Sequence, residues 1–439
     1  MLLTSQPAVV DGAPTGDAGD QRYRVRIWQH LILFVICYAL VISRKPDAIF
    51  HAQFWAEDGR VWFADAYNSG FLRPFFRTET GYFQTLPRLA ADLSLLAPLL
   101  YAPLVLNVIA IAVHVLPVNL LMSHRSREWG AIRFRALLAA SYIAIPSSPE
   151  ICANITNEQW ILAFFVFLLL VASPPVSQVR RSVDVFFIAL SGLTGPFCIF
   201  LLPVSVIAAL RGRDRWRWVP VAILSVCGVV QAIGLTVVSP SARTAWGVLG
   251  ARFDLLVRII GGNVFLGALI GANNIAVIPG AGAFAVLAIA AISGLVFAAF
   301  ALRSAPVSMR LMAFYSGLLL SAALMLPSSY APPGTGQWEM IAKAGAVRYW
   351  FLPTLTFIWL LLYGVFGEVK LLKIVAGALL CFVCFGIAIQ WRRPAFTDLN
   401  YAAEVHRIEA APPGTTLWIP LNPDGWQMRL VKRPTRGQQ

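Results

Sequence analysis

Charged residues are scarce in this chain. Asp, Glu, Lys and Arg make up 13% of its 439 residues, whereas soluble domains contain roughly 25%. Hydrophobic residues make up 58%, against about 45–50% in soluble domains. This composition excludes an ordinary soluble fold and predicts an all-α polytopic membrane protein.

Metal and disulfide chemistry also have few residues to use. The chain has 6 Cys and 5 His. Most cysteines lie inside apolar runs, so no disulfide framework is predicted, and Cys381 and Cys384 are interpreted as small core residues. His114 stands in an apolar run that holds no other His and no carboxylate, and it is expected to be a buried histidine whose hydrogen bonds are satisfied. No set of Asp, Glu and His suits a structural zinc site.

Signals for nucleotide and nucleic-acid binding are missing too. The sequence has no Walker-type GxxxxGK[ST] motif and no strand followed by GxGxxG. Its net charge of +14 comes from Lys and Arg in short clusters between apolar runs, with no continuous basic face. The positive charge therefore indicates membrane topology and lipid contact, and no nucleic-acid partner is expected.

Long apolar runs fill most of the chain. A membrane span needs about 20 apolar residues, or fewer where a short helix is buried in a bundle. We expect a disordered cytoplasmic tail at 1–21, a transmembrane module at 22–390 and a small extracytoplasmic segment at 391–439. The module is predicted to contain about eleven spans, at 27–43, 98–121, 134–146, 159–173, 183–194, 197–210, 218–238, 279–302, 309–327, 350–367 and 370–390.

The distribution of Lys and Arg orients these spans. With the N-terminus in the cytoplasm, every short loop on that side is basic, as in HRSREWGAIRFR and RGRDRWRW. The longer segments, which hold most of the acidic residues, then lie outside, at 44–97, 147–158, 239–278, 328–349 and 391–439. In the last of these we predict a short helix near 400–408 and a hairpin around an NPDG turn. It is too small for its own core and is expected to rest on the outer loops.

The first outer loop, residues 44–97, holds the densest set of polar groups. Its stretch FWAEDGRVWFADA places Glu57 and Asp58 side by side. A helix over 54–67 would put Asp58, Trp62 and Asp65 on one side and would lie in the membrane interface with its tryptophans toward the lipid. The plain interpretation of these acids is the solvated face of that helix, and the alternative is a catalytic site.

The same loop carries a family pattern. Its elements are acid-acid-x-Arg, Gly-x-x-x-Pro, Gly-Tyr-Phe and Pro-x-Leu, formed by Glu57, Asp58 and Arg60, by Gly70 and Pro74, by Gly81, Tyr82 and Phe83, and by Pro87 and Leu89. Over residues 50–95 it resembles the first periplasmic loop of GT-C membrane glycosyltransferases, in particular the group of the lipid A aminoarabinose transferases and protein mannosyltransferases. The first acid here is Glu where that group often has Asp, and Pro87-Arg88-Leu89 stands in place of Pro-Pro-Leu. Which carboxylate is catalytic therefore stays open.

The resemblance implies a GT-C-like fold with interfacial helices in the first outer loop. It also implies an inverting transfer of a sugar from a polyprenyl-phosphate donor to an envelope glycan, a glycolipid or another acceptor, at the outer face of a bacterial inner membrane. Elementary chemistry agrees, because an attacking hydroxyl needs a carboxylate base and a leaving phosphate needs cationic donors. Asp58 is preferred as the base, since a nearby Asp65 would raise its basicity, and Glu57 is second.

Cationic and aromatic residues are candidates for substrate binding. Arg88 and Arg348 are favoured for the phosphate, with Tyr349 beside Arg348, although each arginine alone fits an ordinary interface residue equally well. Arg60 and Tyr82 are further candidates for substrate binding, because they belong to the loop pattern that resembles the transferases.

The second outer loop adds Glu158 and Trp160. They are predicted to line a pocket in which Trp160 stacks on a sugar, or else to mark where a helix meets the lipid headgroups. No cofactor is required by this scheme. A Mg or Mn ion held by Glu57 or Asp58 together with a lipid phosphate is the one metal arrangement that the loop would allow.

Two other classes of function compete with a glycosyltransferase. A lipid or glycolipid transporter or flippase would have ionisable residues near the membrane midplane and paired repeats, and the sequence shows neither. A polysaccharide polymerase or ligase would also have outer arginines but would not require the acidic first loop.

Overall fold

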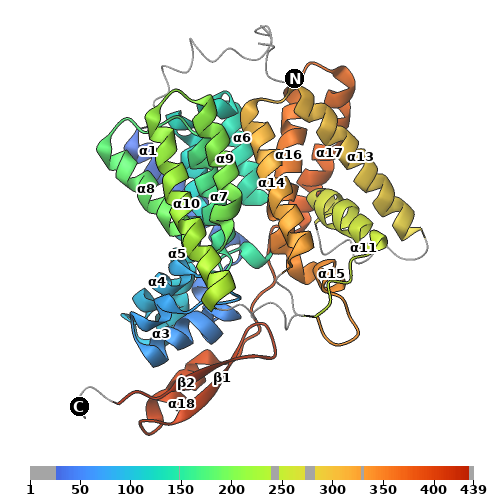
Figure 1. Cartoon of the computed structure of the whole chain (residues 1–439). Coiled ribbons are helices and arrows are strands. Elements are labelled where there is room, and N and C mark those ends of the chain that lie inside the picture. The colour runs from blue at the N-terminus through green and yellow to red at the C-terminus, as the bar shows by residue number, and fades with distance from the viewer. Residues whose placement is uncertain (1–25, 148, 239–246, 272–281, 328–330, 435–439) are drawn as a thin grey trace.

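The computed structural model describes residues 26–147, 149–238, 247–271, 282–327 and 331–434. The predicted disordered tail, residues 1–21, lies outside this part of the chain. Helices dominate the described residues. They form a bundle that carries a small cap of short helices and one hairpin at one end (Figure 1).

The first group of helices comes from the N-terminal half of the chain. Glycine, proline and basic residues separate its apolar segments; between α8 and α9, for example, Gly195 has a φ of 82° and Pro196 caps the next helix. The group comprises α1 (Ile27–Arg44), α5 (Ala102–Met122), α6 (Ile132–Ala144), α7 (Glu158–Val171), α8 (Gln178–Gly192), α9 (Phe197–Arg211) and α10 (Trp218–Ile233), with the π-helical turn η8 (Gly234–Val238).

The second group comes from the C-terminal half. It comprises α11 (Phe253–Val257), η10 (Arg258–Leu266), α12 (Gly267–Ile270), α13 (Ala283–Ser304), α14 (Val307–Met325), α15 (Gln337–Ile341), η12 (Ala344–Trp350), α16 (Phe351–Phe366) and α17 (Lys370–Ile389). α16 is mostly buried inside the bundle, whereas only 17% of the apolar stretch of α1, and 17% of that of α17, is buried. Cys381 and Cys384 are exposed on α17, so their predicted place in the core is wrong. The reason is that α17 is apolar on all sides, and its sequence does not reveal which side packs inward.

Contacts between helix ends show that α1, α5 and α6 alternate in direction along the chain. His30 at the start of α1 lies 3.2 Å from Asn119 near the end of α5, and Arg44 at the end of α1 donates to the carbonyl of Ile143 at the end of α6. We call the end with Arg44 and Ile143 the loop end. The opposite end, which holds the basic connections after α5 and α9, is the basic end.

The predicted spans correspond to helices of the bundle. Within the described residues, eight helical segments are long and apolar enough to cross a membrane, and α7 and α9 are shorter apolar helices. Their apolar outer surfaces suit a lipid environment, which supports a membrane protein. The helices α6 to α9 have 13 to 15 residues each, below the usual span length, so the count of eleven stays a prediction.

One predicted loop is wrong in part. The range 239–278 was expected to be an outer loop, but Phe253–Ile270 is an apolar helix of 18 residues. Its glycines let it approach a neighbour closely: a Cβ on Gly261 would lie 1.9 Å from the carbonyl oxygen of Leu287 in α13. The helix ends at the loop end, where Gln390 donates to the Ile270 carbonyl. Gly250, just before the helix, packs on Gly336, which also lies at the loop end. The segment therefore begins and ends at the loop end, so α13 runs from the loop end to the basic end, as it would after a loop.

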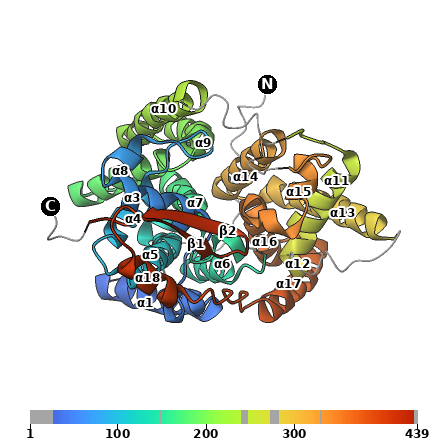
Figure 2. The same cartoon turned by 90° about the horizontal axis from the view of Figure 1, so that it is seen from below.

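Short elements cap the loop end. They are α2 (Asp47–Phe50), the π-helix η2 (Asp58–Phe63), α3 (Ala64–Ser69), η3 (Arg73–Phe76), α4 (Thr85–Ser94), η4 (Leu99–Tyr101), α18 (Tyr401–Ala410), β1 (Thr416–Leu421) and β2 (Trp426–Val431). The strands pair antiparallel with Ile419 opposite Met428, which confirms the predicted hairpin. Figure 2 shows this hairpin crossing the loop end beside α3 and α4. Asn68 of α3 donates to the carbonyl of Arg429, so the C-terminal segment rests on the first loop as expected.

Candidate active site

The helix considered for 54–67 forms from Asp58 on, in η2 and α3, whereas the backbone at Phe54 and Trp55 is extended. Trp55 forms a parallel bridge with Asn422, and the amide of Ala56 donates to the Asn422 carbonyl. Ala56 has a φ of 43°, which ends this extended stretch and lets the helix begin at Asp58. Pairing with the distant hairpin turn thus overrides the local helical pattern and fixes the position of the two carboxylates.

Asp58 joins the first outer loop to the second. Its side chain is 1% exposed, and Oδ1 accepts hydrogen bonds from the backbone amide and the hydroxyl of Thr156. The same Thr156 hydroxyl accepts from Nε1 of Trp62, 2.8 Å away. Within the described residues no donor bonds to the second oxygen, Oδ2. One oxygen is therefore anchored and the other is free to accept a proton.

Burial raises the pKa of Asp58 to about 7, and the neighbouring charge of Glu57 adds to the rise. The hydrogen bonds from Thr156 and the charge of Lys45 oppose it. The expected influence of Asp65 is wrong: Asp65 is not among the groups that shift the pKa of Asp58, and it pairs with Arg77 at 2.7 Å and Arg88 at 3.1 Å.

Trp62 and Arg88 form part of the protein interior. Trp62 is 1% exposed, and the Arg88 guanidinium lies 5.1 Å from its ring centre. Arg88 also donates to the Arg77 carbonyl at 3.0 Å. The expected orientation of the tryptophans toward lipid is therefore wrong for Trp62, since its indole N–H has the buried partner Thr156.

A second cluster unites three predicted residues. The Arg348 guanidinium lies 3.4 Å from the Glu150 carboxylate and 5.0 Å from the Tyr349 ring. Tyr349 in turn lies 5.7 Å from Trp160, whose other neighbour is Phe197 at 4.7 Å. Trp160 is 8% exposed, so in this structure aromatic rings occupy the surface predicted to stack on a sugar.

Acidic groups collect around Asp58. Glu57 is half-buried, and its charge helps to raise the pKa values of Glu79 and Glu150, although burial is the larger cause for both. Tyr82 is buried and pairs with Glu79 through backbone hydrogen bonds of 3.0 and 3.2 Å. Glu79 and Glu150 therefore lie within reach of the charge of Glu57, and the predicted joint role of these residues in one site stays a prediction.

Arg60 lies elsewhere. Its side chain is exposed and its guanidinium lies 5.3 Å from the ring of Trp426 in β2, a contact that connects the helix to the hairpin.

In the described ranges no three His, Cys, Asp or Glu side chains form a group that could hold a metal. A Mg or Mn ion at Glu57 and Asp58 would therefore need further ligands from a bound phosphate.

Three buried cations were not singled out from the sequence. Arg44 donates to the Ile145 carbonyl at 2.7 Å, and Arg393 donates to the Ile145 and Pro146 carbonyls at 2.9 Å each. Lys45 Nζ lies 5.0 Å from the ring of Trp55 and 4.2 Å from that of Phe396. In the described part of the chain none of the three pairs with a carboxylate, and burial with the nearby Arg44 lowers the pKa of Arg393 to about 9.

The signal for these cations was present but weak. Arg44 and Lys45 form the basic pair of SRKPD, and Arg393 belongs to the basic pair of WRRPA; a proline follows each pair. Both pairs lie in segments predicted to be outside, where the distribution of Lys and Arg leads us to expect few cations. The loop end thus combines the buried carboxyl of Asp58, further carboxylates and three buried cations that have no carboxylate partner among the described residues.

His114 is buried and has a partner, which confirms the expected buried, satisfied histidine. Its Nδ1 lies 3.4 Å from Oε1 of Glu158, which is fully buried, and its ring stacks on Tyr142 at 5.4 Å. Oε2 of Glu158 has no hydrogen-bond partner among the described residues. Because 44 positions separate the two residues in sequence, no local pattern predicted this contact.

Comparison with known proteins assigns no function to this chain, so any functional proposal depends on the geometry described above. The chain matches no family model, and neither a curated protein nor a solved structure is significantly similar to it. The likeness of residues 50–95 to the GT-C loop is one of motif, and the function that it implies stays a prediction.

Proposed function

We propose that this chain is a GT-C-type membrane glycosyltransferase. It transfers a sugar from a polyprenyl-phosphate donor to an envelope glycan, a glycolipid or another acceptor at the loop end, with inversion at the anomeric carbon. One observation carries the proposal: Asp58 is buried, anchored through one oxygen, free at the other, and has a pKa of about 7. These are the properties of a general base that works near neutral pH.

The chemistry follows from that carboxylate. An acceptor hydroxyl within hydrogen-bond reach of Asp58 Oδ2 gives up its proton as its oxygen attacks the anomeric carbon. The bond from that carbon to the phosphate oxygen breaks, and its electron pair leaves with the polyprenyl phosphate. Glu57, which is adjacent and half-buried, is the second candidate for the same role.

Positive charge at the loop end favours the leaving phosphate. Arg88 and Arg348 already face the carboxylates of Asp65 and Glu150, which reduces the charge that they offer to a ligand. Lys45 pairs with no carboxylate of the described residues and acts electrostatically on Asp58, so it is the cation best suited to add to the field around a phosphate.

Binding of the lipid donor tests this proposal. We expect mass spectrometry of the gently purified protein to detect a bound polyprenyl phosphate or its sugar adduct. Added polyprenyl phosphate should bind much more tightly than the matched neutral polyprenol, because only the phosphate senses the cations. Equal binding of the two lipids, or binding of neither, contradicts the proposal.

A transporter or flippase for a lipid or glycolipid is the second candidate. The buried pair of His114 and Glu158 favours it, since ionisable groups inside a bundle are typical of transport proteins. In proteoliposomes that hold a fluorescent lipid, a transporter would lose translocation on Glu158→Gln and keep it on Asp58→Asn. The glycosyltransferase proposal predicts no translocation by the wild-type protein.

A further inference from the structure

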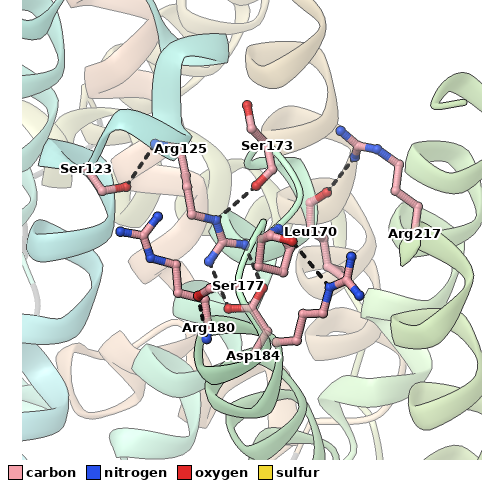
Figure 3. A network of polar contacts seen from close by, with 10 residues as sticks. Ser123, Arg125, Leu170, Ser173, Ser177, Arg180, Asp184 and Arg217 are labelled. Atoms are coloured by element: carbon pink, nitrogen blue, oxygen red, sulfur yellow. Dashed lines mark hydrogen bonds and ion pairs between the residues drawn. The ribbon is translucent and has the colours of Figure 1, made fainter. Parts of the chain in front are cut away.

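A cavity with several polar groups in its lining lies at the basic end, the opposite end of the bundle from Asp58. It is bounded by the end of α7, the segment after it, α8, α9 and the start of α10, and its polar lining includes Arg125, Asp184, Ser205, Trp216 and Arg217. Figure 3 shows the polar contacts around it. None of these residues takes part in the site at the loop end.

One arginine in the lining is neutralised. Arg125 lies in η5 (His124–Trp129) and donates to both oxygens of Asp184, at 2.8 and 2.6 Å. Its Nε donates to the Ser173 carbonyl at 2.9 Å (Figure 3). This two-point ion pair fixes one wall of the cavity and leaves no net charge on it.

The other arginine keeps its charge. Arg217, the last residue of η7 (Arg215–Arg217), donates to the Leu170 carbonyl at 3.3 Å, and no carboxylate of the described residues pairs with it. Next to it, the Arg181 guanidinium stacks 5.1 Å from the Trp216 ring and donates to the Pro175 carbonyl. The cavity is therefore positively charged and has a partly exposed arginine at its rim.

Ser205 supplies an unused hydrogen-bond donor. It lines the cavity from α9 and is 1% exposed, yet its Oγ has no hydrogen-bond partner among the described residues. A buried hydroxyl in a helix usually bonds to a carbonyl of the preceding turn. An unsatisfied one that borders a charged cavity indicates a missing polar ligand.

We propose that this cavity binds the phosphate group of an anionic ligand. The Arg217 guanidinium pairs with the phosphate, the Ser205 hydroxyl donates to one of its oxygens, and the ion pair of Arg125 and Asp184 holds the wall in place. Basic pockets between helices at a membrane surface take up phospholipid headgroups, and a free phosphate has the same chemistry. The proposal is independent of sugar transfer at the loop end.

Native mass spectrometry on the full chain in phosphatidylcholine nanodiscs tests this site. Cardiolipin is titrated as the lipid probe, and inorganic phosphate is added as a soluble competitor. The variants are Arg217→Gln and Ser205→Ala. Arg213→Gln is the matched control, because Arg213 is exposed on the same connection and does not line the cavity.

We expect Arg217→Gln to weaken cardiolipin binding about tenfold, because one charge-assisted hydrogen bond is lost. Ser205→Ala should weaken it several-fold. Arg213→Gln should bind as the wild type does. Displacement of cardiolipin by millimolar phosphate identifies a soluble phosphate as the natural ligand, and its retention identifies a lipid headgroup. If Arg217→Gln and Arg213→Gln lose binding equally, or if neither probe binds the wild type, the proposal is wrong. Ser205→Ala removes only an unpaired hydroxyl and is expected to fold even if Arg217→Gln does not.

Discussion

The carboxyl group of Asp58 makes the stability of the protein depend on pH. Its pKa is about 7 in the folded chain, against an ordinary value near 3.8, so between these values the folded state holds a proton that the unfolded state has lost. The contribution of this carboxyl to stability therefore falls as the pH rises from about 4 to about 7, by up to about 4 kcal/mol, and is constant outside that window.

Asp58→Asn should remove this pH dependence, because an amide carries no charge to desolvate. We expect its thermal melting temperature in detergent to change less between pH 5 and pH 8 than that of the wild type. Asp424→Asn, an exposed change in the hairpin turn, is the control and should follow the wild type. Identical pH slopes for wild type and Asp58→Asn would show that this carboxyl is not buried as described.

Asp65 should matter for folding more than for chemistry. Asp65→Asn leaves the buried guanidinium of Arg88 without its anion, which costs about 3 kcal/mol of unfolding free energy. Arg77→Gln removes only the exposed partner of the same carboxylate and should cost less than about 1 kcal/mol. Denaturation of both variants measures the difference, and equal losses would contradict the buried role of Arg88.

Individual residues were partly predictable from sequence. Glu57 and Asp58 stood out because adjacent acids are unusual beside long apolar runs. Their partners did not, since Thr156 lies 98 positions from Asp58 and Lys45 resembled an ordinary loop cation. Long-range contacts of single polar groups leave no periodic signal in one sequence.

At the scale of elements, apolar runs predicted most helices, and tertiary contacts decided the exceptions. The helix Phe253–Ile270 was missed because Gly261, Gly262 and Asn263 resemble a loop, yet Gly261 packs closely on α13 and Asn263 donates to the Ala342 carbonyl. Residues 54–56 fit a helical pattern but pair with Asn422, which no local rule anticipates.

The contact between helix η2 and the hairpin can be tested at Gly59. A Cβ there would lie 2.9 Å from Cβ of Phe54 and 3.0 Å from the side chain of Leu421, so Gly59→Ala should loosen the hairpin by about 1–3 kcal/mol. Hydrogen exchange of residues 54–66 and 416–431 should rise.

Gly228→Ala is the matched control for this experiment. Gly228 is also helical, but a Cβ there would meet nothing within 4 Å, and alanine favours the helix by up to about 1 kcal/mol. Exchange in the hairpin should be unchanged. Unaltered exchange in Gly59→Ala would contradict the packing of the hairpin on the loop that carries Asp58.

At the scale of the whole molecule, the two ends differ in charge and in role. The basic end holds short connections and the phosphate cavity, and the loop end holds the carboxylates and the cap. If the positive charges face the cytoplasm, the cap with Asp58 lies outside.

Cysteine labelling tests this orientation. In intact cells, an impermeant maleimide should label Asp424→Cys in the hairpin turn and should label Arg213→Cys only after permeabilisation. Both positions are exposed. The parent chain gives the background, because its described cysteines are buried or lie on the apolar surface of α17. Labelling of both positions from the same side would contradict the alternation of the helices.

The rate of sugar transfer in reconstituted membranes tests the central claim most directly. With a polyprenyl-phosphate sugar as donor, Asp58→Asn should fold normally but lose about 10²–10⁴-fold in rate, the contribution of a positioned base, and Glu57→Gln should show this loss instead if Glu57 is the base. Asp424→Asn should keep the wild-type rate. Full activity in both Asp58→Asn and Glu57→Gln would contradict the assignment of these carboxylates and, with it, the proposed mechanism.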